Sequence, residues 1–290
     1  MLFYSRVRIG LLLGALVCAG IWLRSLPREK FTHRAGPHSG VVNLYFRDGA
    51  LVVPVSRRIT NGEVQPRAAM DALLAGPNER SGLMSAIPRG VNVRSLTLNN
   101  SLAEVDLSSE FAGAPDPAAA QFAVVETLTA LPGVRSVSLK VDGKPLAQDV
   151  GRTPLLYYAS RFGMGVQVAQ SRTPRDMVME YLHGPNAAPL TGLPADIRLL
   201  KYDYAPAERS VSLQFSYPPS LRTLALEAPE RMRFVLLGLI ASLTEFAEVE
   251  VVQLDFEGRA RLGVGQCADL LRTPQPRPAL LNDERLLSIR

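Results

Sequence analysis

The segment Leu73-Leu74-Ala75-Gly76-Pro77-Asn78 returns later in the chain as Tyr181-Leu182-His183-Gly184-Pro185-Asn186, at an offset of 108 residues. In each copy the Gly-Pro step follows an apolar run with helical spacing. Glycine permits the left-handed cap that ends a helix, and proline cannot continue one. The motif therefore predicts a repeated helix end. A phosphate-binding loop would instead need several glycines at a helix amino terminus.

Further landmarks recur in the same order on both sides of this motif. The pairs are Leu44-Tyr45-Phe46 with Leu156-Tyr157-Tyr158, residues 129–134 with residues 244–249, and Asp142-Gly143 with Glu257-Gly258. The offset drifts from 108 to 115 residues, as insertions in loops would cause. An ordered set of landmarks at a nearly constant offset indicates a tandem duplication.

Both copies show the same order of predicted elements, ββαββαβ. In the first copy we predict strands at 41–46, 51–55, 91–98, 102–107 and 134–141, with helices at 65–74 and 117–131. In the second copy we predict strands at 155–158, 166–169, 197–204, 210–216 and 249–256, with helices at 174–182 and 229–246. This order predicts an α+β fold in which each copy lays two helices on one face of one sheet.

The repeat and the flanking composition divide the chain into successive parts. We predict a signal anchor or signal peptide at residues 1–25, a linker at 26–40, a first copy at 41–150, a second, degenerate copy at 151–265, and a Pro-rich tail at 266–290. The tail is expected to be partly unstructured or to lie on the second copy.

Arg6 and Arg8 precede an uncharged apolar run at residues 9–23. Such a run spans about 22 Å as a helix, short of the roughly 30 Å hydrocarbon core, and snorkelling arginines could make up the difference. Three interpretations remain open: an uncleaved anchor, cleavage after Ala19, and a lipoprotein acylated at Cys18. In each of them the rest of the chain is expected outside the cytoplasm.

Composition narrows the classes of function. The 290 residues, 47% hydrophobic and 20% charged, suit two folded domains better than one. The net charge is +5, but the arginines are spread along the chain rather than clustered with aromatic residues. This distribution predicts no nucleic-acid binding. The presence of only three histidines and two cysteines argues against a zinc finger, a disulfide scaffold and most histidine-based catalysis.

No residue pattern in the chain predicts catalysis, a metal site or a bound cofactor. Asp106 and Glu110 are the carboxylates to consider for glycan cleavage. Their spacing across a strand end fixes no geometry, and the second copy carries Ser212 and Ser216 at the equivalent places. His183 precedes a helix stop and is predicted to be a helix-end cation that the dipole favours. We therefore predict that the protein is not an enzyme.

The landmarks of the first copy resemble the GerMN family, domains of spore-germination and sporulation proteins and of some actinobacterial cell-envelope lipoproteins. The resemblance is carried by residues 44–46, 51–57, 73–78, 85–90 and 103–111, by Leu131-Pro132-Gly133-Val134 and by Asp142-Gly143. The second copy is degenerate, because Val105-Asp106-Leu107-Ser108 has become Val211-Ser212-Leu213-Gln214. Residues 41–150 and 151–265 are thus expected to be tandem GerMN-like domains.

The resemblance implies a membrane-tethered, extracytoplasmic assembly protein of spore formers, associated with the channel complex between mother cell and forespore and lacking catalytic residues. Its expected partners are proteins of the envelope or sporulation complex; a peptidoglycan- or cell-wall-polymer-binding module is the alternative. The family-motif residues expected to have structural or interaction roles are Arg57, Gly76, Pro77, Asp106, Gly133, Asp142, Gly143, Gly184 and Pro185.

The first copy keeps the fuller motif and is expected to hold more of the interaction surface. Two adjacent arginines, Arg57 and Arg58, lie at the end of a predicted strand. They are expected at the interface, with a merely solvated loop as the alternative. In either case, reversing both charges should leave the fold unchanged, since exposed substitutions usually change stability by less than about 0.5 kcal/mol.

Overall fold

The computed structural model describes residues 40–59, 65–257 and 267–287. The predicted membrane segment at residues 1–25 and nearly all of the predicted linker lie outside these ranges. Within them, no helix has the length and apolar character needed to cross a membrane.

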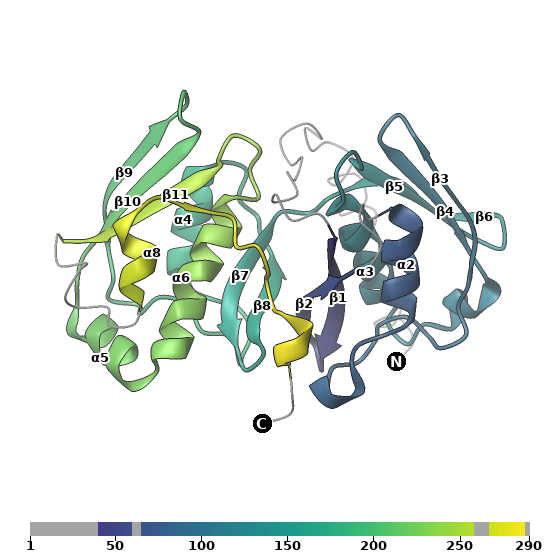
Figure 1. The fold of residues 1–290 in the computed structure, drawn as a ribbon, viewed down its shortest axis with the longest axis horizontal. Helices are drawn as coiled ribbons and strands as arrows, with labels where there is room; N and C mark the ends of the chain where they lie inside the picture. The colour runs from purple at the N-terminus through teal and green to yellow at the C-terminus, as the bar shows by residue number, and fades with distance from the viewer. Residues whose placement is uncertain (1–39, 60–64, 258–266, 288–290) are drawn as a thin grey trace, which may run out of the picture. The chain divides into compact units, whose positions relative to one another are not determined.

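Figure 1 shows the order of elements, which repeats along the chain. The first copy contains β1 (Val41–Asp48), β2 (Leu51–Arg58), α2 (Pro66–Leu74), β3 (Val93–Asn99), β4 (Leu102–Leu107), α3 (Pro117–Thr129), β5 (Ser136–Val141) and β6 (Lys144–Gly151). The second contains β7 (Leu155–Ser160), β8 (Gly163–Val168), α4 (Pro174–His183), β9 (Leu199–Ala205), β10 (Ser210–Phe215), α5 (Pro219–Glu227), α6 (Pro229–Leu243) and β11 (Val251–Phe256). A mixed α+β fold with the predicted element order is confirmed, while β6 and α5 are additions.

The helices begin where the sequence places proline. Each of the five longer helices has a proline in its first turn, where a missing N–H breaks no helical hydrogen bond. Asp116 caps α3 by accepting a hydrogen bond from the Ala119 N–H (3.0 Å), and Thr173 caps α4 through the Asp176 N–H (3.1 Å). These caps satisfy backbone donors that have no partner within the helix.

The strands form three four-stranded sheets, β3-β4-β5-β6, β12-β11-β10-β9 and β1-β2-β8-β7, where β12 is the short strand Gln275–Pro276 of the tail. In the first two, an antiparallel hairpin is followed by a helical crossover to a parallel strand, β4 to β5 and β10 to β11. The third sheet, hereafter the shared sheet, combines the first hairpin of each copy. The expectation of one sheet per copy is therefore wrong, because each copy divides its strands between two sheets.

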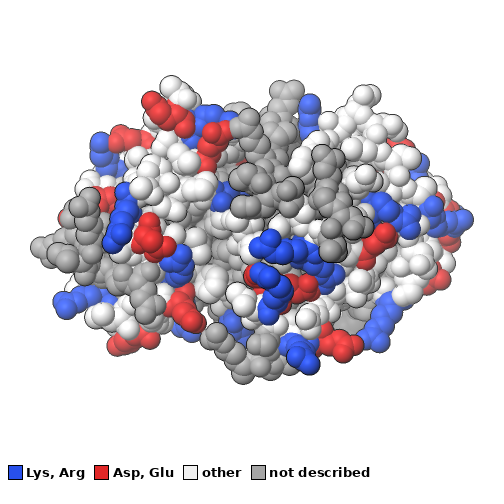
Figure 2. Space-filling view, viewed as in Figure 1, with Lys and Arg blue, Asp and Glu red and all other residues white. Residues whose placement is uncertain are grey.

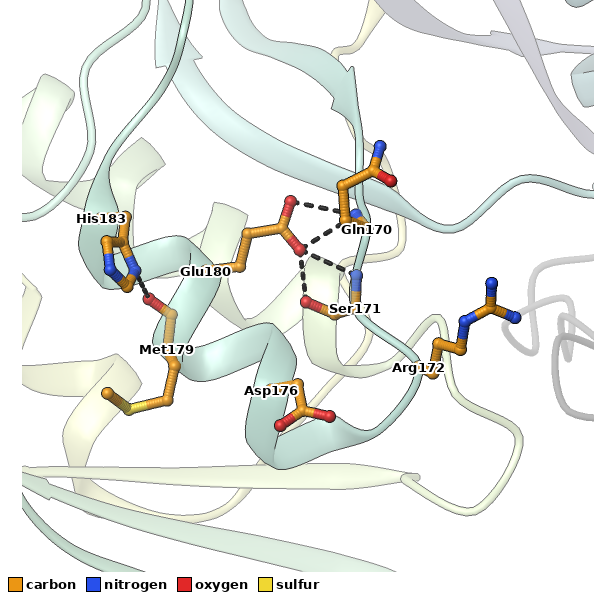
Figure 3. Close-up of a pocket in the computed structure, with 7 residues that line it drawn as sticks. All are labelled: Gln170, Ser171, Arg172, Asp176, Met179, Glu180 and His183. Carbon is orange, nitrogen blue, oxygen red and sulfur yellow. Dashed lines mark hydrogen bonds between the residues drawn. The ribbon is translucent and has the colours of Figure 1, made fainter. Parts of the chain in front are cut away.

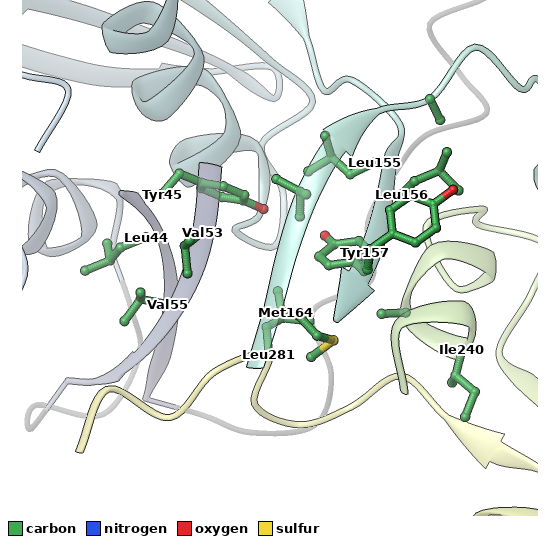
Figure 4. Close-up of a cluster of buried hydrophobic side chains, with 14 of the residues drawn as sticks. Leu44, Tyr45, Val53, Val55, Leu155, Leu156, Tyr157, Met164, Ile240 and Leu281 are labelled. Carbon is green, nitrogen blue, oxygen red and sulfur yellow. The ribbon is translucent and has the colours of Figure 1, made fainter. Parts of the chain in front are cut away.

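The two copies meet in the shared sheet through β2 and β8. Their antiparallel ladder contains the pair Val52 and Val166. Figure 4 shows the buried side chains around this joint, among them Tyr45, Tyr157 and Met164. The two-residue alternation of side chains in a hairpin does not reveal which second hairpin will pair with it, so the sequence pattern did not predict this sheet.

The tail reaches both copies. It forms α8 (Ala268–Arg272), the short strand β12 (Gln275–Pro276) and the 3-10 turn η4 (Glu284–Leu286). β12 pairs with β11 of the second copy, and Asp283 forms an isolated bridge with Ser56 of the first copy. The tail therefore does not lie on the second copy alone, as the sequence had suggested. We refer to residues 275–287 as the strap.

Helix α6 lies very close to β7. A Cβ atom added at Gly238 would lie 2.2 Å from the main-chain oxygen of Tyr157. One turn on, the Ser242 hydroxyl accepts a hydrogen bond from the Tyr157 N–H (2.9 Å). The β7 edge of the shared sheet is thus covered by a helix that supplies a hydrogen-bond acceptor to the edge strand.

We predict that Gly238→Ala destabilises the protein. Alanine improves intrinsic helix propensity by up to about 1 kcal/mol, but overpacking against a main-chain oxygen costs about 1–3 kcal/mol and forces α6 away from β7. The melting temperature should fall by several degrees, about 2–4 °C per kcal/mol for a protein of this size. Gly113→Ala is the matched control, since nothing lies within 4 Å of a Cβ there; equal melting of the two variants would contradict the prediction.

Candidate interaction site

The side chain of Arg57 is held in place by the first copy itself. Its Nη1 donates to the Ala72 carbonyl (2.6 Å) and its Nη2 to the Gly76 carbonyl (2.7 Å). The guanidinium also lies over the Phe46 ring, 5.9 Å from its centroid. Arg57 is therefore not the merely solvated side chain of the alternative interpretation, whereas Arg58 beside it is exposed. The expectation that both charges can be reversed without effect on the fold is wrong for Arg57, because a carboxylate there would lose these contacts.

The guanidinium of Arg57 binds the carboxylate of Glu284 from the strap. Nε donates to Oε2 (2.6 Å), Nη2 donates to Oε1, and the Asn78 N–H donates to the same Oε1 (3.2 Å). The exposed fractions of the two side chains are 20% and 14%. Paired N–H donors matched to both carboxylate oxygens form one of the strongest polar contacts in proteins.

The Gly76-Pro77-Asn78 turn orients both parts of this contact. Helix α2 ends at Leu74, and Gly76 takes a φ of +79°, which a residue with a Cβ adopts only with strain. The turn directs the Gly76 carbonyl toward Arg57 and the Asn78 N–H toward Glu284. The structure thus brings together the predicted motif residues Arg57, Gly76 and Pro77. We call the set of Arg57, Gly76 and Asn78 the carboxylate cradle.

The second copy closes the equivalent turn without an acid. Gly184 again has a positive φ (+84°) and is followed by Pro185. The Asn186 N–H, however, donates to the side-chain oxygen of Gln167 from β8 (3.0 Å). At the repeat offset of 112, buried Ala169 takes the place of Arg57. The carboxylate cradle is therefore a feature of the first copy.

The other predicted motif residues lie in the β3-β4-β5-β6 sheet and its loops. The Asp106 carboxylate accepts a hydrogen bond from the Gly143 N–H (3.0 Å), and Asp142 is ion-paired with Arg94. Asp142 and Gly143 both have positive φ in the β5–β6 turn. Gly133 likewise has a φ of +81° in the loop after α3. Asp106 thus holds a turn, and these residues form a group separate from the carboxylate cradle.

Asn282 of the strap completes the joint between β2 and β8. Its Nδ2 donates to the carbonyls of Pro54 (2.6 Å) and Met164 (2.7 Å), and its Oδ1 accepts from the Met164 N–H (2.8 Å). Pro54 has no N–H with which to continue a ladder toward β8. The buried amide of Asn282 therefore replaces ladder hydrogen bonds that β2 and β8 do not make with each other.

A buried ionic cluster lies beside this joint. Arg152 donates from Nε and Nη2 to the two carboxylate oxygens of Glu245 (2.8 and 3.0 Å). The Tyr157 hydroxyl and Arg277 Nη2 donate to Oε1 of the same carboxylate (2.8 and 2.6 Å). Arg152 precedes β7, Glu245 follows α6, and Arg277 belongs to the strap, so this one carboxylate connects three parts of the chain.

Glu126 extends the cluster into α3 of the first copy. Its Oε1 accepts from the Thr153 N–H (2.9 Å), while its Oε2 lies 3.7 Å from Arg152 Nη1. Burial raises the pKa of the Glu126 carboxyl to about 7, against the opposing attraction of Arg152. Burial likewise raises the pKa of Tyr157 well above its usual range. The cluster consists of charges that neutralise one another inside the fold.

The predictions from sequence included neither this cluster nor the contact of Glu284 with Arg57. A usable signal was present for Glu126, an acid inside the apolar run Val124-Val125-Glu126-Thr127-Leu128 of a helix. A carboxylate on a buried helix face needs a partner, and Arg152 is the partner the structure supplies. No comparable pattern distinguishes Glu284, because its partner Arg57 is separated from it by 227 residues.

A shallow hollow of about 590 Å³ lies on α4 and the loop before it (Figure 3). The Glu180 carboxylate accepts from the N–H groups of Gln170 and Ser171 (3.0 and 2.9 Å) and so holds that loop. His183 is the last residue of α4, and its Nδ1 lies 2.7 Å from the Met179 carbonyl, in the helix-end position predicted for it. These polar groups are engaged within the fold.

Over the described ranges, no three His, Cys, Asp or Glu side chains are grouped so that they could hold a metal ion. Cys267, at the start of α8, is buried and not in a disulfide. Burial raises the pKa of its thiol, which keeps it protonated at neutral pH.

Comparison with known proteins finds a family match within the first copy. Residues 43–147 match the Germane family, described as "Sporulation and spore germination". No curated protein matches the chain. The family resemblance that the sequence predicted is confirmed for this region.

A solved structure has the same fold over most of this chain. The tandem GerMN domains of the sporulation protein GerM from Bacillus subtilis superpose with a TM-score of 0.63 at 18% identity, covering 85% of this chain and 99% of that one. The first GerMN domain of the same protein matches at 22% identity and a TM-score of 0.33, covering 39% of this chain and 97% of that one. A putative lipoprotein from Clostridium perfringens matches at 18% identity and a TM-score of 0.26, covering 40% and 85%. The first of these matches confirms a tandem GerMN fold.

We predict that Arg57→Gln destabilises the protein by about 2–4 kcal/mol, because it leaves the half-buried Glu284 carboxylate and two main-chain carbonyls without their donor. Arg58→Gln, one residue on and exposed, should change the free energy of unfolding by less than about 0.5 kcal/mol. Denaturant unfolding of both variants measures the difference. Similar values for the two would show that the carboxylate cradle adds nothing to the fold.

A second prediction concerns pH. Because the pKa of Glu126 is about 7 in the folded protein and 4.5 ordinarily, the folded state binds more protons between these values. The contribution of Glu126 to stability therefore falls as pH rises from about 4.5 to 7 and is constant above that range. Glu126→Gln removes this contribution while retaining an acceptor for the Thr153 N–H.

The melting temperature of Glu126→Gln relative to the unsubstituted protein should rise across this pH window. Exposed Glu227→Gln serves as the control. The melting temperature of this variant relative to the unsubstituted protein should stay constant across the same window. A pH-independent difference for Glu126→Gln would contradict the assignment.

Proposed function

We propose, starting from the Germane match of residues 43–147 and the tandem GerMN fold, that this protein is a non-enzymatic scaffold of sporulation or germination envelope assembly, tethered to the membrane by residues 9–23 and exposed outside the cytoplasm. The observation that carries the proposal is the family match of the first copy. The charged groups engaged within the fold and the exposed sheet faces support an interaction role over a catalytic one.

The charged groups that could perform chemistry are used to build the fold. Glu245 is bound by two arginines and a tyrosine, and Asp106 holds the β5–β6 turn. Glu110, the other carboxylate considered for glycan cleavage, is fully exposed, and a hydrogen bond from Ser108 lowers its pKa. A general acid for glycan cleavage needs the opposite shift, toward a raised pKa.

The surfaces available to partners are the outer faces and edges of the two unshared sheets. Along β4, Ala103, Val105 and Leu107 are buried, while the alternate side chains face outward. β3 and β9 are edge strands of their sheets, and most of the side chains of β3 are exposed. Edge strands and half-exposed sheet faces are common docking surfaces for other proteins.

The alternative of a cell-wall-polymer-binding module is supported by the net charge of +5. Glycan binding by a protein surface would also need exposed aromatic rings. Tyr45, Tyr157 and Tyr158, the candidates from the sequence, are all buried in the shared sheet. These three rings are therefore not available to a polymer, which supports protein partners.

The proposal predicts that partners bind mainly to the first copy. We compare two full-length variants of equal charge change, Thr97→Lys with Glu104→Lys, and Asp203→Lys with Ser212→Lys. Each pair lies opposite across neighbouring strands, in the first and second copy respectively. Both variants should remain folded, with a similar small loss of melting temperature from the two lysines placed opposite each other, since one side chain of each pair is exposed and the other half-buried.

The measurement is recovery of partner proteins with the full chain from detergent-solubilised sporulating cells. Recovery should fall at least about tenfold for the first-copy variant and remain unchanged for the second. Equal loss in both, or loss in the second alone, would refute the asymmetry. Release of muropeptides by the purified chain, abolished by Asp106→Ala, would overturn the non-enzymatic assignment.

A further inference from the structure

The first copy builds the carboxylate cradle from its own residues, before any contribution from the strap. The carbonyls of Ala72 and Gly76 fix the guanidinium of Arg57, which leaves Nε and one edge of Nη2 directed at the place where the Glu284 carboxylate binds. The Asn78 N–H points to the same place. A guanidinium whose orientation is already fixed loses little further entropy when it binds an acid.

The strap supplies the acid on an extended segment. Before Glu284, Asn282 accepts a hydrogen bond from the Ser56 N–H through its carbonyl (2.7 Å), and the Leu281 N–H donates to the Ser56 hydroxyl (2.9 Å). The contact is thus a short main-chain addition along β2 followed by a carboxylate two residues later. This arrangement is a form of peptide recognition in which a strand edge gives affinity and a side-chain site gives specificity.

The end of the strap, residues 283–287, is held less extensively than residues 275–282, which are fixed by Arg277 in the ionic cluster and by the buried Asn282. It meets β2 through a single bridge, Ser56 with Asp283, instead of a continued ladder. Leu281 and Leu287 are buried, but Leu286 between them is 78% exposed. Segments with few buried apolar contacts open at a lower free-energy cost than the core of a fold.

Basic residues surround this contact. Arg58 is exposed next to Arg57, and Arg285 of the strap is ion-paired with Asp283. Figure 2 shows Lys and Arg side chains gathered on this face, where β2 and η4 lie in Figure 1. Removal of the strap acids would leave Arg57 and Arg58 facing solvent, a surface that complements negative charge.

The second copy shows that the family turn does not require an acid from elsewhere. Its turn amide, Asn186 N–H, is satisfied by Gln167 of its own hairpin. In the first copy the same amide is satisfied by Glu284, which lies 206 residues away. The first copy therefore has a receptor for an acidic side chain where the second has a closed turn.

We infer that the carboxylate cradle, together with the Ser56 edge of β2, is a docking site for an extended acidic segment of a partner protein, and that the end of the strap, residues 283–287, fills this site within the chain until such a segment displaces it. The inference rests on the proposed scaffold function and names the chemistry of one partner. A second copy of this chain is the competing occupant, which the test below separates.

The first test is hydrogen exchange on the full, unsubstituted protein. The amides of Asp283 to Leu287 should exchange at least about tenfold faster than those of β10 and β11, because the end of the strap opens without global unfolding. Exchange of the strap at the same rate as these strands would overturn the inference, since a segment released only on unfolding cannot be displaced by a partner.

The second test measures binding of a fluorescent peptide with the sequence of residues 275–287. Glu284→Gln in the full chain weakens its own strap, so the peptide should bind this variant at least about tenfold more tightly than it binds the unsubstituted protein. Glu227→Gln, on exposed α5, is the matched control and should not change the affinity. No gain in affinity for Glu284→Gln would overturn the inference.

Two further arms test the carboxylate cradle itself. Binding should be lost when Arg57→Gln is added to Glu284→Gln, or when the peptide carries Gln in place of Glu284; binding that survives both would place the peptide elsewhere. A concentration-dependent dimer of the unsubstituted chain that the peptide dissociates would assign the site to a second copy and overturn the partner-protein inference. Failure of these tests leaves the partner-recovery experiment on β3 and β4 unaffected, so the two proposals fail independently.

Discussion

The arrangement of the two copies depends on the Glu245 carboxylate, which Arg152 connects to Glu126 of the first copy. This carboxylate is buried with Arg152, Tyr157 and Arg277 around it, and these residues come from the connection between the copies, from the shared sheet and from the strap. Removal of one partner would leave an uncompensated charge in the interior, at a cost of about 3–5 kcal/mol. The connection, α6 and the Arg277 part of the strap must therefore all reach their final positions for any of them to be stable there.

This cluster is better understood as a determinant of geometry than as a source of net stability. The attraction within a buried ion pair offsets the free-energy cost of desolvating its charges only when the geometry is good. Proteins in which apolar residues replace such a pair are often as stable. Glu126 illustrates the cost, since its Oε2 and Arg152 Nη1 are buried without hydrogen-bond partners in the described structure. Because these charges are stable in one arrangement only, they fix the positions of α3, β7 and α6 relative to the joint. The joint needs such fixing because β2 and β8 share a short ladder that Asn282 completes.

The strap connects this joint to the family motif of the first copy. Within residues 275–287, Arg277 belongs to the ionic cluster, Asn282 completes the β2–β8 joint, and Glu284 binds the carboxylate cradle. Arg57 and Gly76, which the resemblance in sequence predicted to be motif residues, are thereby linked to the last part of the chain. The second copy has replaced this link by a local one, Gln167 to Asn186, which accounts for the asymmetry between two copies of the same fold.

The sequence by itself determined the duplication, the α+β class, the order of elements and the helix ends, because proline, glycine and apolar periodicity act over a few residues. Gly76 and Gly184 take the positive φ that their Gly-Pro steps indicated, and Pro66 and Pro174 begin helices. Only the tertiary structure decided that the first hairpins of both copies form one sheet, that Arg57 binds Glu284, and that Glu126 and Glu245 share Arg152. These contacts join residues tens to hundreds of positions apart, and a charged residue carries no local mark of the distant partner that will neutralise it.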